Sequence, residues 1–292
     1  MAQSFKGKPV ADLVREEVIQ EVAVWKAGGH APKMAVLLVE GDPASYHYAQ
    51  AKGKAAEKLG IDYELHTFSS EVTEDELLKT IGQLNEDQSV HGIMLELPLP
   101  KHIDTKKATA AIDPAKDVDG LTPHNRLATV TGEAGLYPAT PQACIRLLKH
   151  YGHTLAGKDV VLVGRGETVG LPLIHLLLRE NATVTVCHSR TPDIGAHIRK
   201  ADIAFVAVGR KRLITPEMVH PDLLVIDAGI NETEDGGITG DVAPEVIDSV
   251  AGMSPTPGGV GSVTTALLFA NLMRAMKLQN LQAKEVECNG NV

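Results

Sequence analysis

Apolar residues near the start of the chain first recur at helical spacing and then form short continuous runs. After Pro9 they fall three or four positions apart, which predicts a helix, and the run 34–39 has the length of a buried strand. A second helix is predicted over 45–59, where Gly60 ends it, and alternating apolar residues over 61–65 predict another strand. Helices therefore alternate with strands from the beginning of the chain.

This alternation continues to about residue 100 and then weakens. Thr73 and Glu76 have the spacing of a capping box ahead of an apolar helix, and the run 90–95 predicts a further strand. Strands separated by helices favour a mostly parallel sheet with helices on its faces. Between 101 and 141 the periodicity is weak, and Pro, Gly, Asp and Thr are scattered. We therefore predict the domain boundary there.

A second α/β unit is predicted beyond this boundary. Thr140 and Pro141 fit the N-cap and the first residue of a helix, and a final helix is predicted over about 263–276. Strands are predicted at 160–163, 183–187, 203–208 and 223–227, which is the doubly wound pattern. The predicted fold class is α/β in two domains: an N-terminal α/β domain over 1–120 and a Rossmann-like doubly wound parallel sheet over 140–262. The C-terminal helix, 263–292, is free to pack on either domain.

Charge and cysteine content exclude several classes of function. The formal net charge is −9, from 37 acidic and 28 basic residues, and the chain has no basic tract. Nucleic-acid and membrane partners are therefore not expected. The three cysteines are far apart and form no Cys-x-x-Cys pair, and the histidines have no metal-ligand spacing. We expect no metal site and, since the first residues lack the apolar core of a secretory signal, a cytoplasmic location.

A glycine-rich turn follows the predicted strand 160–163. The segment from Gly164 to Gly170 reads GRGETVG and leads into a predicted helix. Glycines permit a tight turn and close approach of a pyrophosphate, which the free N–H groups of a helix N-terminus can bind. The spacing of the last two glycines is one residue longer than in the usual dinucleotide fingerprint. The turn thus predicts a nucleotide site, although a plain strand-to-helix turn fits the same residues.

The residues after the strand 183–187 favour NADP over NAD. An NAD-binding domain usually places an acidic residue here, but this chain has Ser189 and Arg190. A hydroxyl and a guanidinium suit a ribose 2′-phosphate, and Arg165 offers a second guanidinium. The alternative is an ordinary solvated loop.

Tyr48 and Lys52 lie four residues apart on the predicted helix 45–59, so they share one helix face. A phenol and an amine together can stack an aromatic substrate and move a proton. An ordinary half-exposed helix face has the same pattern, and the spacing also occurs in short-chain dehydrogenases. In that family, however, the pair follows the glycine-rich turn, whereas here it precedes it by more than a hundred residues.

Several ordered blocks together resemble the methylenetetrahydrofolate dehydrogenase/methenyltetrahydrofolate cyclohydrolase family. The blocks are 45–52, 92–100, 116–120 (KDVDG), 140–141, 164–172 and 255–261 (PTPGGVG), and they extend over nearly the whole chain. The resemblance implies oxidation of 5,10-methylenetetrahydrofolate by NADP⁺ to the methenyl cation, followed in bifunctional members by hydrolysis to 10-formyltetrahydrofolate. It also implies a cleft between the domains and a homodimer.

The resemblance further implies residue roles. Lys52 is implied as the general acid/base, Tyr48 as a packing surface for the aminobenzoate ring, and Asp119 as the carboxylate that holds the pteridine; without the family, Asp119 would be a turn residue before Gly120. The implied substrate-binding residues are Ser45, Tyr48, Lys52, Leu97, Pro98, Asp119, Pro257, Gly258 and Gly259. The implied cofactor-binding residues are Gly164, Arg165, Gly166, Thr168, Val169, Gly170, Ser189, Arg190, Val208, Gly209 and Ile230.

One departure from the family concerns the cyclohydrolase step. The family usually has Gln-Leu-Pro-Leu-Pro, with the Gln close to the catalytic Lys, but this chain has Glu96 at the first position. A carboxylate beside Lys52 would stabilise its ammonium form. We hypothesise that cyclohydrolase activity is reduced or absent while hydride transfer survives. Two other functions remain open on the residues alone: a short-chain-type carbonyl reductase that uses Tyr48 and Lys52, and a non-catalytic NADP-binding protein.

Overall fold

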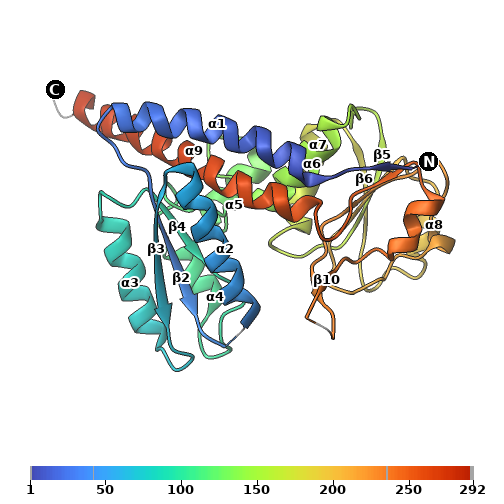
Figure 1. Ribbon diagram of the computed structural model, residues 1–292, viewed down its shortest axis with the longest axis horizontal. Helices are drawn as coiled ribbons and strands as arrows, with labels where there is room; N and C mark the ends of the chain where they lie inside the picture. Colours follow the sequence, from blue (N-terminus) through green and yellow to red (C-terminus); the bar gives the residue numbers. More distant parts are fainter. Residues whose placement is uncertain (1, 42, 235, 290–292) are drawn as a thin grey trace. The chain divides into compact units, whose positions relative to one another are not determined.

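The computed structural model describes residues 2–41, 43–234 and 236–289, without the side chains of 43, 44 and 281–289 (Figure 1). The chain forms two compact units. Unit 1 comprises Met1–Val14 and Pro138–Leu267, and unit 2 comprises Arg15–Tyr137 and Leu268–Val292. Two helices, α1 (Gly7–Ala27) and α9 (Val260–Asn289), are divided between the units. The first part of each helix belongs to unit 1 and the remainder to unit 2.

The compact units differ from the predicted domains at their ends. Residues up to Val14 belong to unit 1, because β1 (Gln3–Ser4) pairs in parallel with β11 (Gly252–Met253). The stretch 121–137, which was expected to connect the domains, belongs to unit 2. Helix α9 passes from unit 1 to unit 2 after Leu267. Within unit 2, Lys277 of α9 forms an ion pair with Glu21 of α1, with 2.6 Å between Nζ and Oε2.

Unit 2 is built on a parallel three-stranded sheet in the order β3-β2-β4. The strands are β2 (Lys33–Val39), β3 (Asp62–Phe68) and β4 (Gly92–Leu95). Alternate residues of β2 pack with α3 (Glu74–Glu86) and α4 (Thr105–Ala110) in one apolar core. Helix α2 (Pro43–Leu59) contacts β2 and β3. All residues of β2 after Lys33 are buried, as expected for a central strand with both faces covered.

The capping box predicted at Thr73 and Glu76 is confirmed at the start of α3. The stretch 101–141, where the periodicity is weak, contains α4 and α5 (Pro123–Thr131), and the boundary between the units, after Tyr137, lies within it. Both helices are too short to show an apolar stripe, and their ends depend on local hydrogen bonds. Asp104 caps α4, while Thr122 caps α5 before it ends at Gly132 with φ of 85°.

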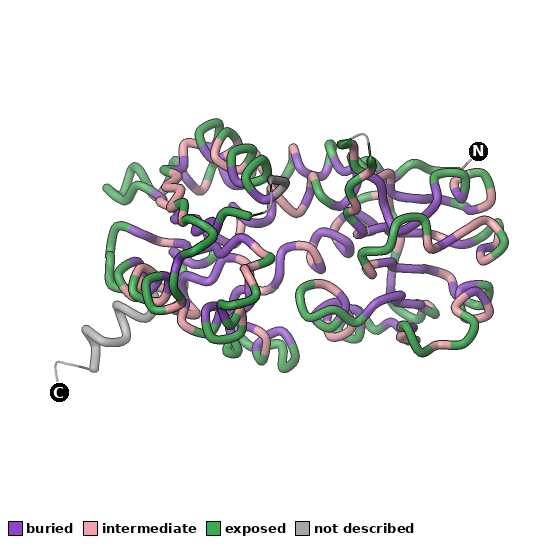
Figure 2. The backbone as a smooth tube through the Cα atoms, turned by 90° about the horizontal axis from the view of Figure 1, so that it is seen from below, coloured by how far each residue is buried: buried purple, intermediate pink, exposed green. Residues whose placement is uncertain are grey.

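Unit 1 contains a six-stranded parallel sheet in the order β1-β11-β8-β7-β5-β6. Its longer strands are β5 (Asp159–Val163), β6 (Thr183–Cys187), β7 (Ile203–Val206) and β8 (Leu224–Asp227), and its helices include α6 (Ala139–His150), α7 (Gly170–Arg179) and α8 (Ile194–Ile198). Shorter elements are β9 (Asn231–Glu232), β10 (Ile238–Thr239) and the 3₁₀ turns η1 (Pro216–Met218) and η2 (Pro244–Ser249). Figure 2 shows buried stretches of the chain in the interior of each unit and exposed stretches at its periphery. The predicted parallel sheet is confirmed.

Two predicted boundaries in unit 1 were wrong. Helix α6 begins at Ala139, and its N-cap is Pro138 without a side-chain cap, so Thr140 is not the cap. Its hydroxyl instead accepts a hydrogen bond of 3.4 Å from the hydroxyl of Thr264. Strand β7 ends at Val206 rather than 208: the N–H of Ala207 still donates to the carbonyl of Val163 in β5, but those of Val208 and Gly209 donate to the Asp241 carboxylate instead of a strand.

Candidate active site

Helix α2 carries Tyr48 and Lys52 one turn apart. The Nζ of Lys52 lies 2.5 Å from Oε1 of Glu96, and the two side chains are only 12% and 8% exposed. Tyr48 is 39% exposed. An ion pair largely removed from water interacts much more strongly than one on the surface. The structure thus brings together an amine and a carboxylate, as the Glu96 hypothesis requires.

The carboxyl edge of the sheet positions Glu96. The residue directly follows β4, and its backbone N–H donates to the carbonyl of Leu37 in β2, at 2.9 Å. Helix α2 begins after the same end of β2, so parallel pairing places the start of α2 and Glu96 at one edge. Ligands of α/β sheets bind at this edge. The peptide bond between the two residues that follow Glu96, Leu97 and Pro98, is cis.

Asp119 lies in a turn that Asp117 organises. The buried Asp117 carboxylate accepts hydrogen bonds from the backbone N–H groups of Leu121 and Thr122 and from the side chain of Asn125. Burial raises the pKa of Asp119 to about 6; Lys52 opposes this rise, whereas Asp117 and Glu96 add to it. Asp119 is therefore within electrostatic range of the Lys52–Glu96 pair, and the three residues are referred to below as the Lys52–Glu96–Asp119 cluster.

Tyr63 is a component of this cluster that the sequence did not reveal. It lies on β3, its hydroxyl donates to the carbonyl of Ala49 at 2.8 Å, and a Cβ at Gly53 would meet its ring at 3.2 Å. Burial, with the charge of Glu96, raises the pKa of Tyr63. In the sequence, the alternation of apolar residues around Tyr63 predicted a strand but no role in the site. Its position against α2 depends on the tertiary fold.

The glycine-rich turn of unit 1 has backbone requirements that only glycine meets. Gly164 has φ of 120°, and a Cβ there would lie 2.1 Å from the carbonyl oxygen of Ala207. A Cβ on Gly170 would lie 2.6 Å from the carbonyl oxygen of Gly164, whereas Gly166 has open space around it. Residues 165–168 are exposed, and α7 begins without a side-chain cap. The turn therefore offers uncapped N–H groups to an anion.

The other predicted cofactor residues surround the same edge of the unit 1 sheet. Ser189 and Arg190 are exposed just after β6, in a turn closed by a hydrogen bond of 3.0 Å from the backbone N–H of His188 to the hydroxyl of Thr191. Val208 and Gly209 follow β7, and Ile230, which is 53% exposed, follows β8. In parallel strands these positions share the carboxyl edge.

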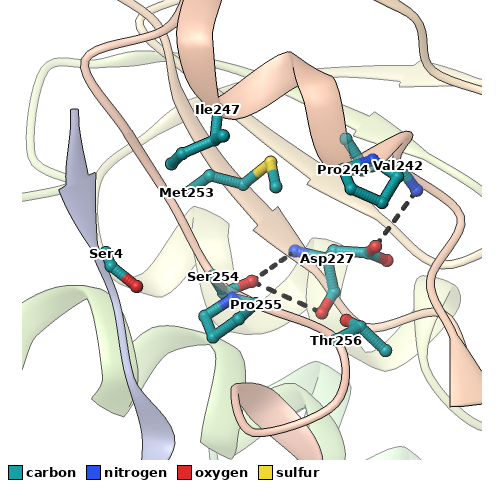
Figure 3. Close-up of a pocket in the computed structure, with 9 residues that line it drawn as sticks. All are labelled: Ser4, Asp227, Val242, Pro244, Ile247, Met253, Ser254, Pro255 and Thr256. Atoms are coloured by element: carbon teal, nitrogen blue, oxygen red, sulfur yellow. Dashed lines mark hydrogen bonds between the residues drawn. The ribbon is translucent and has the colours of Figure 1, made fainter. Parts of the chain in front are cut away.

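Pro257, Gly258 and Gly259 lie in unit 1, unlike the other predicted substrate residues, which lie in unit 2. The Thr256–Pro257 bond is cis, and Gly258 has φ of 99°. The carbonyl of Gly258 accepts a hydrogen bond of 2.7 Å from the backbone N–H of Gly7. A cavity of about 210 Å³ lies beside this loop (Figure 3). Its lining residues are Ser4, Asp227, Val242, Pro244, Ile247, Met253, Ser254, Pro255 and Thr256.

Among the described residues, no cluster of three or more His, Cys, Asp or Glu side chains could hold a metal ion. No helix formed by the described residues is long and apolar enough to cross a membrane.

Both units match sequence models of one family. Residues 5–119 match the catalytic domain of tetrahydrofolate dehydrogenase/cyclohydrolase, and residues 138–280 match its NAD(P)-binding domain. The chain belongs to the tetrahydrofolate dehydrogenase/cyclohydrolase family. Family membership and the two-domain α/β fold are thus confirmed.

Relatives of this family match along almost their whole length. The bifunctional protein FolD of Heliobacterium modesticaldum is 54% identical over 285 residues, which cover 97% of this chain and 99% of the relative. The crystal structure of the bifunctional FolD dehydrogenase/cyclohydrolase of Campylobacter jejuni has a TM-score of 0.92 and 38% identity over 96% of this chain and all of that one. A Trypanosoma brucei FolD, solved with NADP cofactor and an inhibitor, has a TM-score of 0.90 and 34% identity over 95% and 98% of the two chains.

The match to both domain models disfavours the two alternatives. A short-chain carbonyl reductase would carry Tyr48 and Lys52 behind the glycine-rich turn, whereas the family order places them in the separate catalytic domain. Both domain models describe a dehydrogenase/cyclohydrolase, so a protein that only binds NADP is not favoured either.

Proposed function

We propose that this chain oxidises 5,10-methylenetetrahydrofolate with NADP⁺ and hydrolyses the methenyl product slowly. The observation that carries this proposal is the Lys52–Glu96 ion pair of 2.5 Å beside Asp119, at the carboxyl edge of a domain that matches the family's catalytic domain. The alternatives to this activity do not account for that cluster together with a second, dinucleotide-binding unit.

The residues of unit 1 fit NADP. The open space around Gly166 and the uncapped start of α7 suit a pyrophosphate, and the exposed Arg190 offers a cation where NAD-binding domains carry a carboxylate. We assign Gly164, Arg165, Gly166, Thr168, Val169 and Gly170 to the phosphates and Ser189 and Arg190 to the 2′-phosphate. When bound there, NADP would supply the hydride acceptor, and these residues would hold and orient it.

The residues of unit 2 position the folate. An ionised Asp119 can accept two hydrogen bonds from the amino-pyrimidine edge of the pterin, and the half-exposed Tyr48 can pack on the aminobenzoate ring. The loss of hydride leaves a positive charge on the one-carbon bridge. The carboxylates of Glu96 and Asp119 favour that charge electrostatically, so hydride transfer is compatible with Glu96.

The second step places different demands on Lys52. Water must add to the methenyl carbon and lose a proton, after which the ring opens to 10-formyltetrahydrofolate. A basic amine would assist this step, but the amine of Lys52 is engaged in an ion pair of 2.5 Å with the Glu96 carboxylate. We therefore propose that Glu96 lowers cyclohydrolase activity relative to dehydrogenase activity.

Two spectrophotometric assays test the proposal. NADPH formation from methylenetetrahydrofolate should be rapid with NADP⁺ and slower with NAD⁺, and Lys52→Met should abolish turnover without weakening NADP binding. Hydrolysis of methenyltetrahydrofolate should be faster in Glu96→Gln than in the natural chain. Rapid hydrolysis at equal rates in both proteins would refute the role of Glu96. Absence of NADPH formation would refute the proposed activity itself.

The setting of the enzyme is also part of the proposal. The family resemblance supports a homodimer and a contribution to purine biosynthesis, which consumes 10-formyltetrahydrofolate. The three dispersed cysteines, two of which are buried and free, support a reducing cytoplasmic environment.

A further inference from the structure

Unit 1 contains two buried aspartates that the proposed chemistry does not use. Asp227 ends strand β8 and is 3% exposed, and Asp241 follows β10 and is fully buried. Carboxylates are rarely buried to this extent unless hydrogen bonds compensate them. Their partners are therefore informative.

Asp241 binds three consecutive backbone N–H groups of the loop after β7. Its Oδ2 accepts from Val208 at 2.6 Å and Gly209 at 3.0 Å, and its Oδ1 accepts from Arg210 at 2.7 Å. The side-chain amide of Asn231 donates a fourth hydrogen bond to Oδ1, at 2.9 Å. One carboxylate thus determines the path of residues 208–210 and joins them to the segment after β8.

Asp227 in turn holds the backbone of Asp241. Its Oδ1 accepts from the N–H of Gly229 at 2.8 Å and of Asp241 at 3.2 Å, and its Oδ2 accepts from Val242 at 3.0 Å. The backbone N–H of Asp227 donates to Oγ of Ser254 at 2.8 Å, which Figure 3 shows beside the cavity. The two aspartates therefore form a chain of hydrogen bonds from β8 to the loop after β7.

Two glycines make room for these carboxylates. A Cβ on Gly229 would lie 2.2 Å from Cγ of Asp241, and a Cβ on Gly240 would lie 1.8 Å from Oδ2 of Asp227. Side chains at either position would displace the carboxylates. The residues Asp227, Gly229, Gly240 and Asp241 therefore act as one unit, although they come from two separate segments.

The loop that Asp241 holds lies against the glycine-rich turn. A Cβ on Gly164 would lie 2.1 Å from the carbonyl oxygen of Ala207 and 3.2 Å from Cγ1 of Val208. We propose that Asp241, supported by Asp227, is a positioning residue that holds 208–210 and Ile230 in the arrangement that binds the dinucleotide. This inference rests on the proposed NADP function.

An amide cannot replace the Asp241 carboxylate. All four partners are N–H donors, and an ionised carboxylate is a pure acceptor, whereas an amide presents an NH₂ group at one of the two positions. In Asp241→Asn, that NH₂ would face the N–H groups of Val208 and Gly209 at the Oδ2 position, or the N–H of Arg210 and the Asn231 amide at the Oδ1 position. At least one backbone N–H would lose its acceptor, and the loop would shift. The substitution preserves size, so it tests the acceptor role directly.

The test is NADPH binding by calorimetry, together with steady-state kinetics, for the natural chain and Asp241→Asn. We expect the Kd for NADPH and the KM for NADP⁺ to rise about tenfold, the equivalent of one lost hydrogen bond to a charged group. The KM for methylenetetrahydrofolate should change less than twofold. Asp248→Asn, an exposed carboxylate of the same unit, serves as the control and should change neither constant.

Two results would overturn the proposal. One is a lower melting temperature of Asp241→Asn with an unchanged Kd for NADPH, which would indicate a role in stability alone. If this variant does not fold, Asn231→Ala removes only the side-chain donor; a Kd raised severalfold supports the proposal, and an unchanged Kd contradicts it. A natural chain that does not bind NADPH would instead refute the proposed function, so the two failures are distinguishable.

Discussion

Replacing Glu96 with glutamine should move the pH dependence of folate binding to lower pH. Burial raises the pKa of Asp119 from its ordinary 3.8 to about 6, and the Glu96 charge contributes to that rise while Lys52 opposes it. Removing the Glu96 charge therefore lowers the pKa of Asp119. Removing the Lys52 charge, in Lys52→Met, raises it.

The size of the effect follows from the Asp119 pKa. A rise from 3.8 to about 6 favours the protonated carboxyl by about 3 kcal/mol. With this pKa, about one-tenth of Asp119 is protonated at pH 7 and about nine-tenths at pH 5. If the ionised carboxylate holds the pterin, folate affinity falls about tenfold between these two pH values.

The Kd of a chemically stable folate analogue, measured from pH 5 to 8, tests this reasoning. The midpoint of the affinity loss should lie near pH 6 in the natural chain, lower in Glu96→Gln and higher in Lys52→Met. Glu86→Gln, which changes an exposed carboxylate of the same unit, should leave the midpoint unchanged. The same midpoint in all four proteins, or opposite shifts, would show that Asp119 is not the titrating group.

Two further substitutions test the cofactor assignment and the fold of unit 2. Arg190→Ala should weaken NADP⁺ binding about tenfold and leave NAD⁺ binding unchanged, because only the 2′-phosphate requires the guanidinium; equal losses for both nucleotides would contradict the assignment. Lys116→Met should lower the free energy of unfolding, measured with urea, by about 2–3 kcal/mol. The reason is that the buried Lys116 side chain donates hydrogen bonds to three backbone carbonyls at the end of α3, those of Leu84, Asn85 and Asp87. The exposed Lys101→Met is the control, and an equal loss there would refute the explanation.

Local pattern was sufficient for much of this protein. The strands and longer helices, the capping box at Thr73 and the turn at Gly164 depend on neighbours within a few residues, so their signals are present in the sequence. The order of the motifs was likewise sufficient to identify the family. The nearness of Glu96 to Lys52 was expected only because the family pattern was known.

Tertiary structure decided the rest, because it depends on contacts between distant segments. Helices α4 and α5 are too short for a detectable period, and the two residues of β1 become a strand only by pairing with β11, some 250 positions away. Buried polar residues show this most clearly. Asp117 and Asp241 look like loop residues in the sequence, but each is buried among N–H donors that no local pattern reveals. The energy of a buried charge is determined by the groups around it, and only the folded chain brings those groups together.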